Sequence, residues 1–75
     1  MKRLKNFTAI IEKEDDGYVA LCPELDIASQ GDSIKEAKHN LQEAVELFFE
    51  YASEDEVVSR FKSDIFITNM QIAVE

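Results

Sequence analysis

The chain has 75 residues, of which 45% are hydrophobic and 32% charged, so it has the composition of a folded globular protein and not of a disordered tail. A chain this short is expected to form a single domain, residues 1–75, whose small core leaves apolar surface for self-association to bury. Sixteen acidic and eight basic residues give a net charge of −8, which repels phosphate backbones and argues against direct nucleic-acid binding.

Cysteine content and hydropathy indicate the compartment. Cys22 is the only cysteine, so an internal disulfide is excluded. The sequence shows no charged-then-apolar leader, and no apolar run approaches the roughly 18 residues of a membrane-spanning helix. The sequence therefore predicts a protein of the reducing cytoplasm that does not enter a membrane.

Two strands joined by an acidic turn are predicted first. Residues 4–13, "LKNFTAIIEK", alternate their apolar side chains with the period of two that a strand requires. "EDDG", residues 14–17, is an acidic turn in which Gly17 is available for a positive φ, and the β-rich "YVALC" follows. Pro23 has no amide hydrogen and restricts Cys22 to an extended conformation, so the second strand is expected to end there.

A loop and a third strand are expected to lead into a helix. "ELD" carries the chain outward, residues 27–30 form a short strand, and Gly31 supplies the backbone freedom for the turn that follows. "SIKE", residues 33–36, is a capping box, in which the Ser33 hydroxyl accepts from the Glu36 amide and the Glu36 side chain reaches back to the Ser33 amide. Apolar residues then recur at spacings of three and four, which predicts one long amphipathic helix over about residues 34–52.

The last third of the chain contains a weaker and a stronger signal. "SEDE", residues 53–56, can cap a second helix, so the segment after it is interpreted as either a short helix or a loop. Residues 64–74, "DIFITNMQIAV", again alternate with a period of two. This alternation predicts a fourth strand.

The predicted element order is strand, strand, strand, helix, strand. It indicates an α+β fold with a three-stranded antiparallel sheet, one long helix packed on one face, and then a further strand. One helix covers only one face, whereas apolar residues such as Ile10 and Leu21 are expected on the other. We therefore expect a homodimer or higher oligomer, with the last strand, which includes Ile65 and Ile67, offering an edge for the contact.

Acidic residues raise the alternative of an enzyme, because carboxylates on adjacent strands can hold magnesium for phosphodiester cleavage. The candidate ligands are Glu12, Asp15, Asp16, Glu24, Asp26 and Asp32. Their spacing matches no metal-ligand motif, and neither His39 nor Cys22 has an evident catalytic partner, so no catalytic residue, metal or cofactor is predicted. The basic cluster of Lys2, Arg3 and Lys5 is interpreted as protection of a strand edge.

The segment "IIEKEDDGYVALCPELDIASQGDSIKEAKHNLQEAVELFFE" closely resembles the HicB-like antitoxin family, also described as the UPF0150-like domain. That family has an acidic turn, then Gly-Tyr-hydrophobic-Ala, Pro-Glu-Leu, and a Gly-Asp-Thr/Ser entry to a helix. The matching residues are Gly17, Tyr18, Ala20, Pro23, Glu24, Leu25, Gly31, Asp32 and Ser33. The match spans roughly residues 7–50, more than half of the chain.

The resemblance implies a truncated ribonuclease-H-like sheet and a function. Members of the family bind and neutralise HicA, a small basic ribonuclease that cleaves messenger RNA, and an acidic chain is the electrostatic complement of such a partner. Longer members carry a C-terminal DNA-binding module, whereas residues 53–75 are too few and too acidic for one, so no separate DNA-binding domain is expected.

The predicted partner-binding residues are Glu24, Leu25 and Asp26, because Pro23 stiffens their loop and Leu25 offers an apolar tip between two acids. The helix face with Glu43, Glu46 and Glu50 is the next candidate surface. Two other functions stay open, namely a solitary oligomeric or ligand-binding module of the same fold without a toxin partner, and a metal-dependent nuclease.

Overall fold

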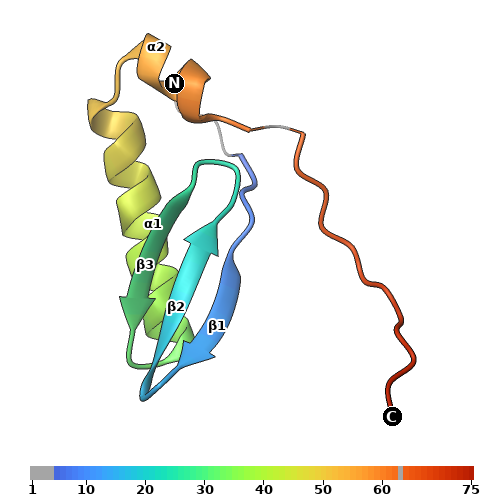
Figure 1. The fold of residues 1–75 in the computed structure, drawn as a ribbon. Helices are drawn as coiled ribbons and strands as arrows, with labels where there is room; N and C mark the ends of the chain where they lie inside the picture. The colour runs from blue at the N-terminus through green and yellow to red at the C-terminus, as the bar shows by residue number, and fades with distance from the viewer. Residues whose placement is uncertain (1–4, 63) are drawn as a thin grey trace.

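The computed structural model describes residues 5–62 and 64–75 and shows three strands followed by two helices (Figure 1). The strands are β1 (Ile10–Glu14), β2 (Gly17–Cys22) and β3 (Ile27–Gly31), and the helices are α1 (Ile34–Tyr51) and α2 (Glu54–Arg60). The sheet is antiparallel in the order β1-β2-β3, and α1 lies on one face, mainly over β3 and β2 (Figure 1). The structure confirms the α+β class, the three-stranded antiparallel sheet and the long helix that packs on it. The first strand was predicted over residues 4–13, and this prediction is wrong for residues 5–9, because pairing with β2 ends at Ile10 and Leu21; Leu4 lies outside the described residues.

The β1–β2 hairpin is closed by a loop of two acidic residues. Glu14 pairs with Gly17 and Ile10 with Leu21, which leaves Asp15 and Asp16 in the loop. Asp15 takes the positive φ, at 52°, and Gly17 does not. The prediction for Gly17 is therefore wrong, because aspartate tolerates the left-handed region well enough to form the turn without glycine.

Gly31 has a packing role in place of the conformational role expected for it. Its φ is not positive, but a Cβ built on it would lie only 2.5 Å from the backbone nitrogen of Ala37. The absence of a side chain thus lets the end of β3 approach the first turn of α1 closely. This contact fixes the position of the helix on the sheet.

Both helices begin at a serine cap. Ser33 Oγ accepts a hydrogen bond from the Glu36 amide at 3.0 Å, as the capping box predicts, whereas the Glu36 carboxylate accepts from the Asp32 amide and not from that of Ser33. Ser53 Oγ accepts from the Glu56 amide at 3.2 Å, and three acids occupy the first turn of α2. The segment after "SEDE" is therefore a helix.

The core lies between the sheet and α1 and is small. Its fully buried members are Ala20, Cys22, Leu25, Ala37 and Leu41. Half-buried side chains pack around them, namely Phe7, Ile11, Tyr18, Ile27, Val45 and Phe48. Five fully buried residues among those that the structure describes make a small core, so contacts at its edge carry a large share of the stability.

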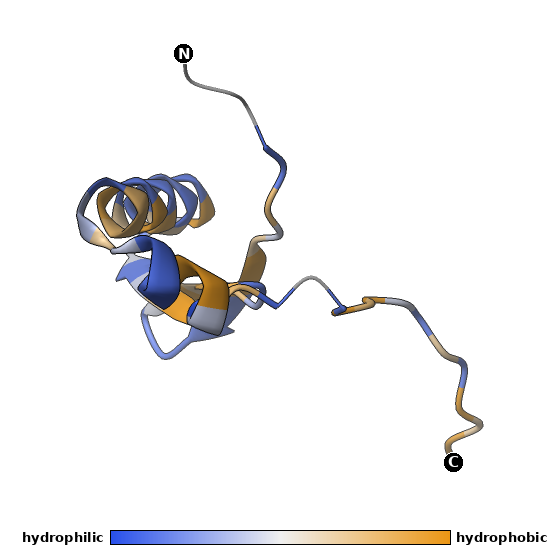
Figure 2. Ribbon diagram, turned by 90° about the horizontal axis from the view of Figure 1, so that it is seen from above, coloured by the Kyte–Doolittle hydropathy of each residue, from blue (hydrophilic) through white to orange (hydrophobic). Residues whose placement is uncertain are grey.

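Residues 64–75, here called the C-terminal arm, are extended but form no strand and leave the body of the molecule (Figures 1 and 2). The prediction of a fourth strand over residues 64–74 is wrong for the single chain. A strand requires a neighbouring strand as well as the right alternation, and the arm has no such neighbour in the described chain.

Candidate functional site

The loop predicted to bind a partner, residues 23–26, joins β2 to β3 and is tied to the rest of the molecule. Leu25 is 0% exposed and belongs to the core, so the expectation that it forms an exposed apolar tip is wrong. The loop bends inward because the Leu25 amide donates to the Cys22 carbonyl and Asp26 takes a positive φ of 56°. Leu25 thereby closes one end of the core, and only Asp26 presents an exposed side chain.

Glu24 is engaged within the chain. Its carboxylate accepts from the Thr8 hydroxyl at 2.7 Å and from the Thr8 amide at 3.1 and 3.2 Å. Partial burial pushes the pKa of Glu24 upward, but the hydrogen bonds from Thr8 outweigh it and hold the pKa below its ordinary value. This carboxylate therefore anchors the segment before β1 to the β2–β3 loop.

α2 holds the same loop from the other side. Arg60 donates from Nε and Nη2 to the Leu25 carbonyl, at 3.2 and 3.0 Å, and from Nη2 to the Asp26 carbonyl at 3.1 Å. The Lys62 amide donates to the Glu24 carbonyl at 2.7 Å. The Arg60 guanidinium also lies 5.5 Å from the centre of the Phe48 ring, within the range of a cation–π contact. These contacts make the loop a structural junction, and no local sequence pattern predicted them.

An acidic hollow of about 490 Å³ lies at the opposite end of the sheet, where the β1–β2 turn approaches the connection from β3 to α1. Its acidic lining residues are Glu14, Asp15, Asp16, Asp32 and Glu36. The remaining lining residues, Gly17, Tyr18, Val19, Gln30 and Gly31, are uncharged, so no lysine or arginine of the described residues lines the hollow. The hollow is open and acidic, a shape and charge suited to a basic protruding side chain.

Asp15, Asp16 and Asp32 were grouped from the sequence as candidate magnesium ligands, but nothing in the sequence indicated that they line one hollow together with Glu14 and Glu36. Asp15 and Asp16 come from the hairpin, whereas Asp32 and Glu36 come from the helix entry, and the close approach at Gly31 brings the two segments together. The sequence contained one signal for this convergence. The β1–β2 turn and the connection from β3 to α1 lie at the same end of an antiparallel sheet.

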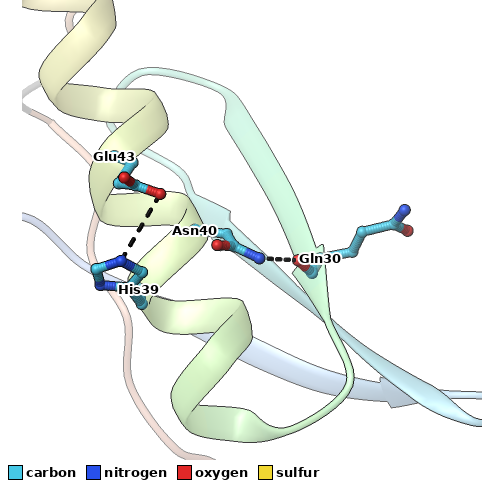
Figure 3. A network of polar contacts seen from close by, with 4 residues as sticks. All are labelled: Gln30, His39, Asn40 and Glu43. Carbon is cyan, nitrogen blue, oxygen red and sulfur yellow. Dashed lines mark hydrogen bonds and ion pairs between the residues drawn. The ribbon is translucent and has the colours of Figure 1, made fainter.

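Metal and nucleophile candidates find little support in the geometry. Across residues 5–62 and 64–75, no three His, Cys, Asp or Glu side chains are arranged as metal ligands. Cys22 is 1% exposed, and burial followed by the neighbouring Glu24 carboxylate raises the pKa of its thiol. His39 lies on the exposed side of α1, 3.7 Å from Glu43 (Figure 3).

Neither α1 nor α2 is long and apolar enough to cross a membrane.

These features define a small acidic α+β protein with an acidic hollow at one end of its sheet. The chain is 41% identical over 76 residues to the UPF0150 protein ssr1765 of Synechocystis sp., an alignment that covers 97% of this chain and 94% of that protein. It is 39% identical over 66 residues to a UPF0150 protein of Helicobacter pylori, covering 87% and 92% of the two chains. The chain belongs to the UPF0150 family.

A further Synechocystis relative, the UPF0150 protein ssl0738, is 54% identical over 50 residues, which cover 64% of this chain and 69% of that protein. No family model matches the chain, and no solved structure matches it.

Proposed function

We propose that this chain is an antitoxin of the HicB-like type, which neutralises a small basic HicA-type ribonuclease by protein–protein contact. Membership of the UPF0150 family supports the proposal, as do the matches at Gly17, Pro23 and Gly31 to the HicB-like pattern. The observation that carries it is the convergence of five carboxylates, without a basic residue, in one hollow on a chain of net charge −8. The proposal places the chain in the cytoplasm, where messenger RNA and its ribonucleases meet.

The acidic hollow is the proposed docking site. A ribonuclease that binds RNA presents lysine and arginine side chains around its active site, and a negative hollow attracts these groups and competes with the phosphates of the substrate. Of the residues predicted to dock, Glu24 and Leu25 are committed to contacts within the fold. Asp26 alone stays available as a secondary contact from that loop.

Association kinetics with a HicA-type ribonuclease test the docking site. Glu14→Lys combined with Asp16→Lys reverses two charges of the hollow, and both side chains are exposed. Steering by close complementary charges raises association rates by ten- to a thousandfold, so the double variant is expected to associate at least about tenfold more slowly at low salt. The effect should shrink as the Debye length falls below about 10 Å.

The matched control is Glu46→Lys combined with Glu50→Lys, which makes the same change of net charge on the exposed side of α1. If both pairs slow association equally, only the net charge matters and the hollow is not the docking site. If the α1 pair has the larger effect, the helix face is the docking surface. Absence of any binding at micromolar concentration contradicts the antitoxin function itself.

The open alternatives are separated by two further measurements. We propose that the chain has no nuclease activity of its own, so labelled RNA incubated with it in magnesium or manganese should stay intact. Cleavage that disappears in Asp15→Asn or Asp16→Asn would favour the metal-dependent nuclease. A solitary module is favoured if no short basic open reading frame lies beside the gene and no HicA-type ribonuclease binds.

A further inference from the structure

The C-terminal arm exposes more apolar surface than an isolated tail normally carries. Phe66, Met70 and Val74 are 88, 83 and 85% exposed, and Ile72 on the same side of the arm is also exposed. These side chains alternate with a second row, which has Ile65 and Ile67 near α2 and then Asn69, Gln71 and Ala73 in the outer half of the arm. A period of two with one strongly apolar row is typical of a strand that buries one face.

The arm also makes the single chain unusually extended. The radius of gyration is 14.6 Å, compared with about 11 Å expected for a compact domain of this length. The arm leaves the body in both views and contributes no strand to the described sheet (Figures 1 and 2). A segment with the pattern of a strand thus has no partner strand among the described residues of its own chain.

One edge of the sheet is already covered. On the β3 edge, Asn40 Nδ2 of α1 donates a hydrogen bond to the Gln30 carbonyl at 2.8 Å (Figure 3). α1 lies closest to β3, so this edge has both a side-chain partner and a neighbouring helix. Another strand cannot add there without displacing Asn40.

At the β1 edge, the described part of the chain supplies no neighbouring strand. Because the hairpin loop has two residues, Glu14 and Gly17 form a hydrogen-bonded pair, and pairs then alternate along the ladder. Ile11 and Lys13 therefore point their amides and carbonyls away from β2, toward the free edge. α1 covers β1 least of the three strands, so β1 lies at the side of the sheet away from the helix (Figure 1).

We propose that the C-terminal arm of one copy adds as a fourth strand to the β1 edge of a second copy, and that the exchange is reciprocal in a symmetric dimer. The row with Phe66, Met70 and Ile72 then lies on the α1 side of the sheet, and the row with Asn69 and Gln71 lies on the open side. Each copy supplies one arm and one edge, so the exchange leaves neither unpaired. This inference does not depend on the antitoxin function.

The root of the arm favours a second copy over the chain's own sheet. The Phe61 ring packs edge-on against Phe7, with 6.1 Å between ring centres, which fixes the end of α2 beside the segment that precedes β1. Phe61 itself has extended backbone angles, with φ −72° and ψ 121°, and residues 64–75 are extended as well (Figure 1). No glycine or proline occurs in residues 61–75 to reverse its direction, and the arm points away from the body (Figure 2).

The test combines the mass in solution with hydrogen exchange on the full chain. Sedimentation at micromolar concentration should give the mass of a dimer, and the amides of Ile11 and Lys13 should be protected in it. Phe66→Asp combined with Ile72→Asp places charge in the apolar row and should raise the dimer dissociation constant at least 100-fold. The same variant should lose protection at both amides.

The matched control is Asn69→Asp combined with Gln71→Asp, which adds the same charge at the two polar positions of the second row and should change the dissociation constant by less than threefold. Circular dichroism of each variant checks that the helices persist. A monomer without edge protection overturns the proposal, and a monomer with protected Ile11 and Lys13 amides shows that the arm folds onto its own sheet. A dimer whose edge amides exchange freely overturns it as well, because that dimer would form through another surface.

Discussion

Replacing Leu25 with alanine is expected to destabilise this protein strongly, although Leu25 lies in a loop between two acids. The side chain is 0% exposed and is one of five that make up the fully buried core. Leu→Ala substitutions in cores cost about 2–5 kcal/mol, and the cost is higher where the surroundings cannot collapse into the cavity. Arg60 and Lys62 hold the loop backbone in place, so collapse is restricted and a loss of about 3 kcal/mol is expected.

That loss is large for a chain of this length. Domains have net stabilities of about 0.05–0.15 kcal/mol per residue, or roughly 4–11 kcal/mol here. A change of about 3 kcal/mol corresponds to a decrease in the melting temperature of roughly 12–24 °C. The free energy of unfolding is measured by urea titration followed by circular dichroism at one protein concentration, since any self-association also contributes to it.

The control for this prediction is Asp26→Asn. Asp26 is exposed and has a positive φ, which asparagine also tolerates, so the free energy of unfolding should change by less than about 0.5 kcal/mol. If Leu25→Ala costs no more than this control, Leu25 is not a core residue and the account of the β2–β3 loop is refuted.

Three further predictions concern residues that hold the sheet, the β2–β3 loop and α1 together. Gly31→Ala should lower the melting temperature more than Gly17→Ala does, because its Cβ would meet the Ala37 nitrogen at 2.5 Å, whereas the nearest atom at Gly17 is 3.0 Å away; equal losses would refute the close-approach role. The pKa of Glu24 is lowered in the folded state, so its ionised form stabilises the fold fully above the unfolded pKa of about 4.3, and this contribution disappears as the pH falls through the folded pKa. As the pH is lowered from 5, the free energy of unfolding should therefore decrease less for Glu24→Gln than for the parent chain. An equal decrease in the two proteins would contradict the anchoring role. Burial raises the pKa of the Cys22 thiol and shields it, so a thiol reagent should modify Cys22 at least about 100-fold more slowly in the native protein than in denaturant.

Local patterns predicted the elements whose signals lie within a few residues. The Ser33–Glu36 capping box and the spacing of apolar residues after it predicted α1, whose observed bounds are Ile34–Tyr51. Pro23 correctly marked the end of β2 at Cys22. Such signals act through hydrogen bonds and side-chain spacing that are complete within one element, so they can be recognised in the sequence.

Contacts between distant residues were not predictable in this way. The hydrogen bonds from Thr8 to Glu24 and from Arg60 to Leu25 join residues 16 and 35 positions apart, and they turn a loop that was expected to be exposed into part of the core. The arm illustrates the converse case. Its alternation was recognised correctly, but pairing requires an edge, and the alternation of residues 64–74 does not indicate which edge or which copy supplies it.

The central claim, that this UPF0150 protein neutralises a basic ribonuclease, is tested most directly by titrating the purified full chain into a fixed amount of a HicA-type ribonuclease and measuring cleavage of labelled RNA. Cleavage is expected to fall in proportion to the chain added and to stop near one equivalent per ribonuclease. The Glu14→Lys and Asp16→Lys double variant should require a large excess to reach the same inhibition. Cleavage that continues at an unchanged rate in a tenfold excess of the parent chain would contradict the claim.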